Sequence, residues 1–280
     1  MDITQEIPQF IDIEKIIASK NSALLKWMPR FLLNYIKRTV HQDEVNYVLH
    51  TYGKDASGLP FVDAIITQHW RASYDAFGLD DIPLNGRYVF ASNHPLGAFD
   101  GLILLKAIGA RFPEVKFIVN DLLLNLEPLQ PLFVPINKHG RQSVDYAKRI
   151  DETYFSPTIQ VLYFPAGLCS RRYHGVITDP PWKRNFLQKA IQSQRDVVPV
   201  YFEGRNSRFF YNLSSLRRKL GIKANIEMFY LPDEFFKQKD AHYTVRFGNP
   251  IPWQTFDKSR KPDEWTQFVR DKVYALGAKQ

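Results

Sequence analysis

ASNHPLGAFDG, residues 91–101, follows a short apolar run and precedes a second apolar run whose spacing is helical. This change of pattern predicts a turn that joins the end of a β-strand to the first turn of an α-helix. Turns of this kind, at the carboxyl ends of strands, are where α/β proteins build their sites. The stretch therefore predicts an α/β fold and a functional site at this turn.

Strand-like and helical runs alternate from residue 87 onwards. The strand-like runs cover residues 88–91, 115–119, 133–136, 159–164, 197–202, 227–230 and 244–247. The helical runs cover residues 101–110, 142–154, 182–194 and 207–220, and a last helix is expected after Pro262. This alternation predicts a mixed central sheet covered by helices, in an α/β domain that spans residues 81–280.

Residues 1–80 lack strand-like runs and are predicted to form an N-terminal helical extension. Within it, residues 22–40 combine apolar side chains at helical spacing with several Lys and Arg, and Pro29 is a point where the helix can kink. A cationic amphipathic helix of this kind lies in the interface of a membrane. The alternative, a helix packed on the main domain with a solvated basic face, fits the pattern equally well.

The composition of the 280 residues, with 45% hydrophobic and 24% charged side chains, excludes a disordered, collagen-like or coiled-coil chain. The formal net charge of +8 indicates anionic partners. The single cysteine, Cys169, excludes an intrachain disulfide framework and a Cys-based zinc site, and it suits a reducing compartment. No apolar run reaches the length of a bilayer span, and the first residues lack a secretory pattern. We therefore expect an intracellular protein.

The turn at residues 91–101 holds His94 and Asp100 six positions apart. An imidazole can take a proton from a hydroxyl, and a carboxylate on its other nitrogen fixes the tautomer and stabilises the imidazolium that forms. No protein nucleophile accompanies the pair, so the nucleophile would be the hydroxyl of the substrate. The alternative is a structural turn, in which His94 caps the strand end and Asp100 caps the helix.

Four blocks of sequence carry a resemblance to a known family. They are Asn93 and His94 with Asp100, then FVPIN at residues 133–137, FPAG at residues 164–167 followed by Ser170 and Arg171, and VPV at residues 198–200. In this order and spacing the chain resembles the glycerolphosphate and lysophospholipid acyltransferase superfamily. Within it, the chain is similar to the bacterial haemolysin-like branch and to the O-acyltransferases that complete ornithine-type or glycine-type aminolipids.

The resemblance implies transfer of a fatty acyl group from an acyl carrier protein or coenzyme A thioester to the hydroxyl of a lysolipid. The acceptor would be lysophosphatidic acid or a lyso-aminolipid, and no metal or redox cofactor is implied. His94 would be the general base and Asp100 its orienting carboxylate, one position further away than in the commonest form of the family. Ala166 stands where the family usually has Glu, a residue assigned to acceptor binding, and this departure argues against a glycerol 3-phosphate acceptor.

Further residues in and beside the blocks are expected to bind substrate. Exposed amides of the turn at Gly167 are candidates for holding the thioester oxyanion. Arg171 and Arg172 suit a phosphate or carboxylate, with a solvated basic loop as the alternative. Lys138 or Arg141 would replace an Arg that the family often has, unless they are ordinary surface charges. The predicted set is Asn93, Gly97, Asn137, Lys138, Arg141, Gly167, Ser170, Arg171, Arg172 and Arg205.

Together these observations predict a cytoplasmic O-acyltransferase, peripheral on the inner face of the cell membrane. Its partners would be the acyl thioester, an anionic membrane surface and the lysolipid. Two rivals remain at this point. One is a catalytically inactive lipid-binding protein of the same fold, and the other is a basic nucleic-acid-binding protein. No nucleic-acid-binding motif accompanies the basic residues, so we expect no nucleic-acid partner.

Overall fold

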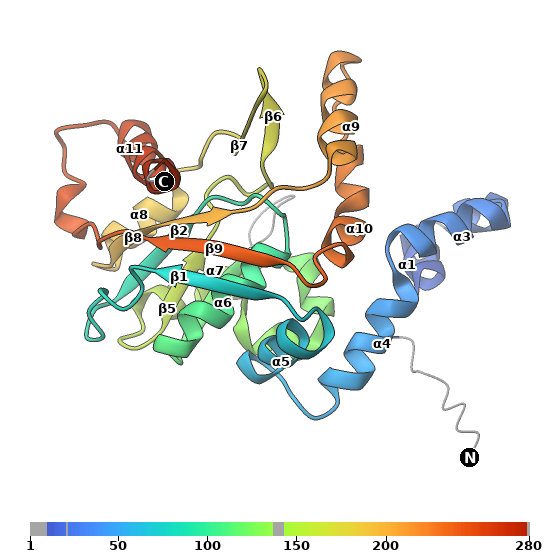
Figure 1. The fold of residues 1–280 in the computed structure, drawn as a ribbon, viewed down its shortest axis with the longest axis horizontal. Helices are drawn as coiled ribbons and strands as arrows, with labels where there is room; N and C mark the ends of the chain where they lie inside the picture. Colours follow the sequence, from blue (N-terminus) through green and yellow to red (C-terminus); the bar gives the residue numbers. More distant parts are fainter. Residues whose placement is uncertain (1–9, 21, 137–142, 279–280) are drawn as a thin grey trace.

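The computed structural model describes residues 10–20, 22–136 and 143–278, and its centre is a seven-stranded sheet (Figure 1). The strand order is β1-β9-β8-β2-β5-β3-β4. Neighbours run parallel except β8 and β9, which are antiparallel. The bounds are β1 Ser73–Phe77, β2 Tyr88–Ser92, β3 Val115–Asn120, β4 Phe133–Ile136, β5 Gln160–Tyr163, β8 Asp196–Glu203 and β9 His242–Phe247. The predicted mixed α/β sheet is thus confirmed.

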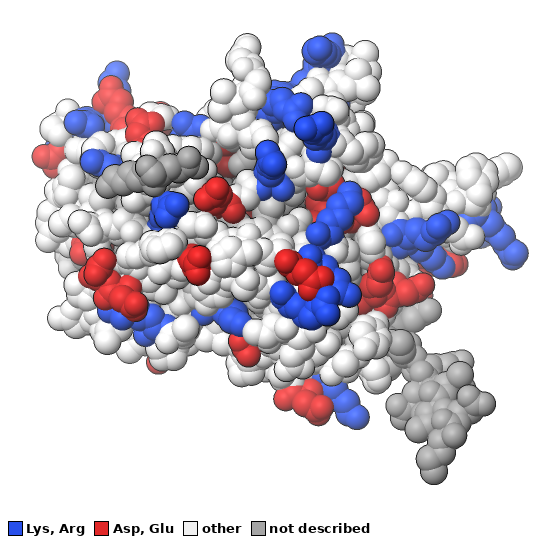
Figure 2. Space-filling model, viewed as in Figure 1, with Lys and Arg blue, Asp and Glu red and all other residues white. Residues whose placement is uncertain are grey.

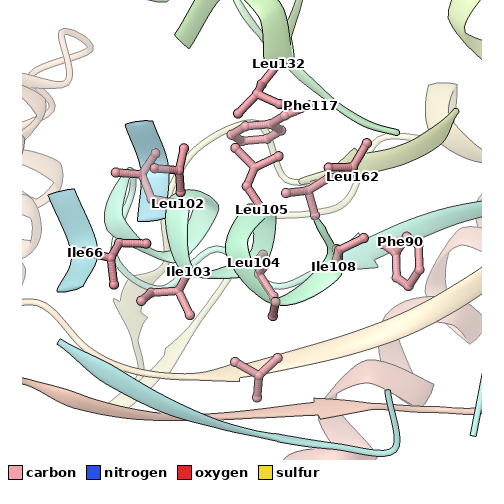
Figure 3. Close-up of a cluster of buried hydrophobic side chains, with 14 of the residues drawn as sticks. Ile66, Phe90, Leu102, Ile103, Leu104, Leu105, Ile108, Phe117, Leu132 and Leu162 are labelled. Atoms are coloured by element: carbon pink, nitrogen blue, oxygen red, sulfur yellow. The ribbon is translucent and has the colours of Figure 1, made fainter. Parts of the chain in front are cut away.

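Helices cover both faces of this sheet. The bounds are α4 Gln42–Gly53, α5 Leu59–Ala64, α6 Phe99–Arg111, α7 Val144–Phe155, α8 Asn185–Gln192 and α11 Pro262–Gly277. Alternate residues of β2 point to opposite faces, so Phe90 packs with α4, α5 and α6, while Val89 packs with α7, α8 and α11. Helix α6 lies in the larger cluster, where its leucines and isoleucines meet Phe117 and Leu162 (Figure 3). Nine of its thirteen residues are buried, Asp100 in its first turn among them.

Several segments differ from the sequence-based prediction, α10 Leu231–Phe236 and the 3-10 helices between β3 and β4 among them. Strand β1 lies in the part predicted to be entirely helical, and it is an edge strand paired with β9. Residues 227–230, predicted as a strand, belong to the 3-10 helix η4, Ile226–Tyr230. In this conformation the buried Glu227 forms ion pairs with Arg171 and Arg217. A two-stranded ribbon, β6 Arg171–Tyr173 and β7 Val176–Thr178, was not predicted.

The N-terminal segment forms α1 Ile13–Lys20, α2 Ser22–Trp27 and α3 Arg30–Thr39, which project from the body of the molecule (Figure 1). The predicted single helix over residues 22–40 is interrupted between α2 and α3. The interruption lies next to Pro29, which has no amide hydrogen to continue a helix. Trp27 is 86% exposed and Phe31 is 76% exposed, so neither is packed on the main domain. Within the described residues, no helix is long and apolar enough to cross a bilayer.

At the carboxyl end of β8, α9 Arg208–Lys219 follows the strand and is joined by η4 to α10. In Figure 1, α9 and α10 stand at the same end of the molecule as α1 and α3. Strands β2, β5 and β8 are parallel, so their carboxyl ends also lie at this end. The turn after β2 therefore opens toward α10 and the N-terminal helices.

Candidate active site

The first residue after β2 anchors the turn at residues 93–98 to the neighbouring strand. The side chain of Asn93 is buried and bonds the main chain of Phe202 twice: its Oδ1 accepts from the Phe202 amide at 2.7 Å, and its Nδ2 donates to the Phe202 carbonyl at 2.9 Å. These bonds fasten the end of β2 to β8. Asn93, predicted to bind substrate, therefore has a positioning role in this structure.

The turn reverses at Gly97, whose φ of +90° lies in the left-handed region that glycine adopts readily. A Cβ at this position would also lie 2.9 Å from Leu231 Cδ2 and 3.1 Å from Cys169 Sγ. Both conformation and space thus require glycine here. The reversal brings Asp100, in the first turn of α6, back beneath His94.

His94 and Asp100 form the pair that the sequence predicts. The Nδ1 of His94 lies 2.9 Å from Oδ2 of Asp100. Asp100 is fully buried, and its oxygens also accept from the amides of Leu96 and Gly101, both at 3.0 Å. The carboxylate is therefore held rigidly, and it favours the tautomer with hydrogen on Nδ1 and an acceptor at Nε2. The imidazole stacks on Phe164 with ring centroids 3.9 Å apart.

A second carboxylate, which the sequence analysis missed, holds the main chain of His94. Oδ1 of Asp179 accepts from the His94 amide at 3.2 Å and from the Ser170 hydroxyl at 2.6 Å, and Oδ2 accepts from Trp182 Nε1 at 2.9 Å. The Ser170 amide in turn donates to the His94 carbonyl at 2.8 Å. Burial raises the pKa of Asp179, although the bonds from Ser170 and Trp182 oppose the shift. Ser170, predicted to bind substrate, is likewise buried and serves this anchor.

A cavity of about 1340 Å³ opens beside His94. Its walls are mostly apolar and come from α4, α5, α6, β3 and α10, with Leu102, Phe117 and Phe235 among them. Its volume exceeds the roughly 300–1,000 Å³ usual for small-molecule sites, which suits a ligand with a long hydrocarbon chain. The side chain of His94 is only 13% exposed, so a hydroxyl that reaches Nε2 from this cavity is largely removed from water.

Arg171 does not face the cavity, contrary to the prediction that it binds an anion. It is 3% exposed, and its Nε lies 2.9 Å from Oε1 of Glu227. Its Nη1 donates to the Cys169 carbonyl at 2.7 Å, and the guanidinium covers the Phe210 ring. Arg217 pairs with the same carboxylate at 2.8 Å. Arg171 is thus a structural residue that ties the β6–β7 ribbon to η4.

The other predicted binding residues of the third and fourth blocks lie apart from His94 or are already engaged. Arg172 donates to Asn212 Oδ1 at 3.0 Å, on α9. Arg205 is exposed in the loop after β8, and neither arginine lines the cavity. Gly167 does line the cavity, but its amide donates to the Phe164 carbonyl at 3.0 Å within the turn. That amide therefore is not the open oxyanion donor expected from the sequence.

Three predicted residues, Asn137, Lys138 and Arg141, lie outside the described residues. Among the residues that are described, no group of three or more His, Cys, Asp or Glu side chains is placed to hold a metal ion. The expectation that no metal or redox cofactor is used stays a prediction. Cys169 is buried, and burial raises the pKa of its thiol to about 11, so the thiolate needed of a nucleophile is scarce near neutral pH.

Comparison with known proteins shows the family of the chain. The model of a family described as acyltransferase matches residues 15–279. A lyso-glycine lipid O-acyltransferase from Bacteroides thetaiotaomicron is 49% identical over 267 residues, which cover 95% of this chain and 97% of the relative. A lyso-glycine lipid O-acyltransferase from Phocaeicola vulgatus is 48% identical, with 95% of each chain covered.

The fold is also similar to that of a solved structure. The 1-acyl-sn-glycerophosphate acyltransferase PlsC from Thermotoga maritima superposes with a TM-score of 0.50 and 13% identity, over 96% of each chain. At this identity the likeness concerns the architecture alone. It agrees with the mixed sheet and the flanking helices described above.

Proposed function

The chain belongs to this acyltransferase family, and on that premise we propose that it transfers a fatty acyl group from a thioester to the hydroxyl of a lyso-glycine lipid. Two relatives of that name share about half of its residues over nearly their whole length. Ala166 in the third block supports the same choice, because the family resemblance assigns a Glu at that position to acceptor binding in glycerophosphate enzymes. The observation that carries the mechanism is the His94–Asp100 pair on the wall of the apolar cavity.

The proposed reaction uses the acceptor hydroxyl as nucleophile. Nδ1 of His94 is engaged by Asp100, so Nε2 takes the hydroxyl proton as the oxygen attacks the thioester carbonyl carbon. The tetrahedral intermediate then collapses, the carbon–sulfur bond breaks, and the imidazolium returns its proton to the departing thiolate. The products are an ester and a free thiol. Asp100 stabilises the imidazolium between these two steps.

The cavity provides the apolar phase for the acyl chains. Leu49, Phe61, Leu102 and Phe133 line it and belong to the main hydrophobic cluster. Burial of a chain against such walls contributes about 0.8 kcal/mol for each methylene removed from water. The donor is proposed to be an acyl carrier protein or coenzyme A thioester, both of which are anionic and suit a chain of net charge +8.

Membrane attachment is proposed to occur through α2 and α3, on the inner face of the cell membrane. Trp27 and Phe31 are the most exposed aromatic side chains of these helices, and Lys26 and Arg30 accompany them. Helices of this composition bind the interface through apolar burial and attraction to anionic lipid. The exposed state of Trp27 favours this proposal over the alternative of a helix packed on the main domain.

An acyl-transfer assay with purified protein tests the proposal. The donor is an acyl carrier protein or coenzyme A thioester, and each acceptor lipid is assayed separately. We expect ester formation with a lyso-glycine lipid at a higher kcat/KM than with lysophosphatidic acid. Transfer to lysophosphatidic acid alone would overturn the acceptor assignment while leaving the acyltransferase intact. Absence of transfer with every donor and acceptor pair would overturn the proposed function as a whole.

A further inference from the structure

A second exposed apolar surface lies at the end of α9. Leu216 and Leu220 are more than half exposed, and Ile222 and Ile226 follow them in the exposed connection to η4. We call these four side chains, with Lys219 and Lys223, the α9 surface. Clusters of large apolar side chains left in contact with water mark places where a protein meets an apolar partner.

The positive charge of the chain is concentrated at this surface and at the N-terminal helices. Residues 204–226 contain six Lys or Arg and no Asp or Glu, and five of the six are free of the buried cluster in which Arg217 pairs with Glu227; residues 15–42 also contain six Lys or Arg and no Asp or Glu. These two segments hold twelve of the 37 Lys and Arg, so the remainder of the chain has more acidic than basic residues. Figure 2 shows Lys and Arg side chains over α9 and along α3. The net charge of +8 is thus a property of one end of the molecule.

A chain of aromatic contacts joins the two segments. The hydroxyl of Tyr35, on α3, lies 2.7 Å from that of Tyr230, at the end of η4. The ring of Phe209, on α9, meets the Tyr230 ring edge-on at a centroid distance of 5.0 Å. Tyr35 and Phe209 are both about half exposed. Contacts through Tyr230 therefore join α3 to the first turn of α9.

The inner side of the same connection forms part of the cavity wall. Met228 of η4 and Leu231 and Phe235 of α10 line the cavity beside His94. Whatever covers the outer side of α9 and η4 consequently lies next to the cavity that contains His94. The occupant must offer an apolar phase to leucine and isoleucine side chains and negative charge to the surrounding cations.

We infer that the α9 surface is a second membrane-binding surface, which contacts anionic lipid together with α2 and α3 and places the cavity at the bilayer. A lipid surface fits better than an acidic protein, because the exposed aliphatic side chains are interspersed with lysines, as in interfacial helices, and α9 lies at the same end of the molecule as α3, which carries the exposed Phe31 (Figure 1). The inference rests on the proposed membrane-facing function and extends it to a part of the chain remote in sequence from α2 and α3.

Vesicle sedimentation with the full chain tests this inference, using phosphatidylcholine vesicles with and without phosphatidylglycerol. Leu220→Glu is expected to lower binding to the anionic vesicles about tenfold. It removes a leucine that is buried only when the protein is bound to the bilayer, and it adds a negative charge that anionic lipid repels. Leu84→Glu is the matched control: Leu84 is 63% exposed against 65% for Leu220, but it precedes the amino end of β2, whereas α9 follows the carboxyl end of the parallel strand β8. This control should bind like the wild type.

A second variant, which leaves the apolar side chains in place, guards against misfolding of Leu220→Glu. Lys219→Ala with Lys223→Ala keeps the apolar side chains and should weaken anionic binding about fivefold for each lysine, with no effect on uncharged vesicles. Turnover of a short-chain, micelle-free acceptor is measured in parallel. All these variants should retain it, because none of the altered residues lines the cavity.

Wild-type vesicle binding by Leu220→Glu and by the double lysine variant would overturn the inference. An unchanged vesicle affinity with a raised KM for acyl carrier protein would also overturn it, and would make the α9 surface a protein-docking surface. Wild-type protein that does not bind anionic vesicles would overturn it too. Failure of the proposed function is a separate result, since it appears as absent turnover with the short-chain acceptor.

Discussion

Two buried carboxylates of this protein, Asp100 and Glu227, are paired with basic side chains in almost the same geometry. Nδ1 of His94 lies 2.9 Å from Oδ2 of Asp100, and Nε of Arg171 lies 2.9 Å from Oε1 of Glu227. They differ in what is left over. His94 keeps Nε2 and lies on the cavity wall, whereas the guanidinium of Arg171 is enclosed by Glu227, Cys169 and Phe210. What distinguishes the two is therefore a nitrogen with a free lone pair that substrate can reach. A short pairing between a base and a carboxylate does not by itself indicate an active site.

The largest effect expected from this contrast is on catalysis by His94. His94→Ala should lower kcat by about a hundredfold to ten-thousandfold, because it removes the proton acceptor for the attacking hydroxyl. The melting temperature should change little. His242→Ala is the matched control, because Nε2 of His242 also pairs with a carboxylate, Asp75, at 3.1 Å, but on the exposed edge of the sheet. Equal loss of turnover in both variants would break the contrast.

The Arg171 cluster should show the reverse pattern, a loss of stability with turnover retained per folded molecule. Arg171→Met removes one partner from a buried ion cluster, which typically costs about 3–5 kcal/mol. Urea unfolding measures this change. Arg172→Met changes the neighbouring, more exposed side chain and is the control. Its free energy of unfolding should stay within about 0.5 kcal/mol of the wild-type value. If Arg171→Met were as stable as the wild type but had a raised acceptor KM, Arg171 would belong to the substrate site after all.

The same cluster predicts a dependence of stability on acid. Burial acts to raise the pKa of Glu227, but the hydrogen bond from its own backbone amide and the bonds from Arg171 and Arg217 together outweigh it, and the pKa is lowered from 4.5. The folded state thus binds fewer protons than the unfolded state, so this contribution is complete above pH 4.5 and is lost as the pH falls through the folded pKa. Arg171→Met should therefore lose less stability than the wild type in that acidic window.

The elements predicted correctly are those whose own residues carry the signal. Strand β2 is buried along its whole length and α6 nearly so, and both produce continuous apolar runs. Strand β1, with the sequence SYDAF, has no fully buried residue and alternates between exposed and half-buried positions, so its pairing with β9 is invisible locally. The segment 227–230 has strand-like residues, yet Glu227 is fixed by two arginines from other elements.

The site divides in the same way. His94 and Asp100 were predicted because a single turn contains both. Asp179, 85 positions after His94, was missed because its bonds to the His94 amide and to Ser170 exist only in the folded chain. Arg171 was placed wrongly because charge beside a glycine turn does not disclose whether the side chain points outward or into a buried partner.

Asp179 offers a smaller, sharper test of how the turn is held. Asp179→Asn keeps the size of the side chain but replaces one accepting oxygen, so the bonds to His94, Ser170 and Trp182 cannot all be kept. A small displacement of His94 should lower kcat about tenfold with the acceptor KM unchanged. Steady-state kinetics with the preferred acceptor measures both. A change confined to KM would place Asp179 in substrate binding and not in the positioning of His94.

The central claim is that Asp100 acts through His94, and a double-variant cycle tests it most directly. Asp100→Asn alone should lower kcat about a hundredfold, because the amide no longer favours the required tautomer or stabilises the imidazolium. In a chain that already carries His94→Ala, Asp100→Asn should have no further effect on kcat, because the imidazole through which Asp100 acts is absent. The account predicts that the kcat of the double variant equals that of His94→Ala within about twofold. A further hundredfold loss in the double variant would show that Asp100 acts independently of His94, and would contradict the account.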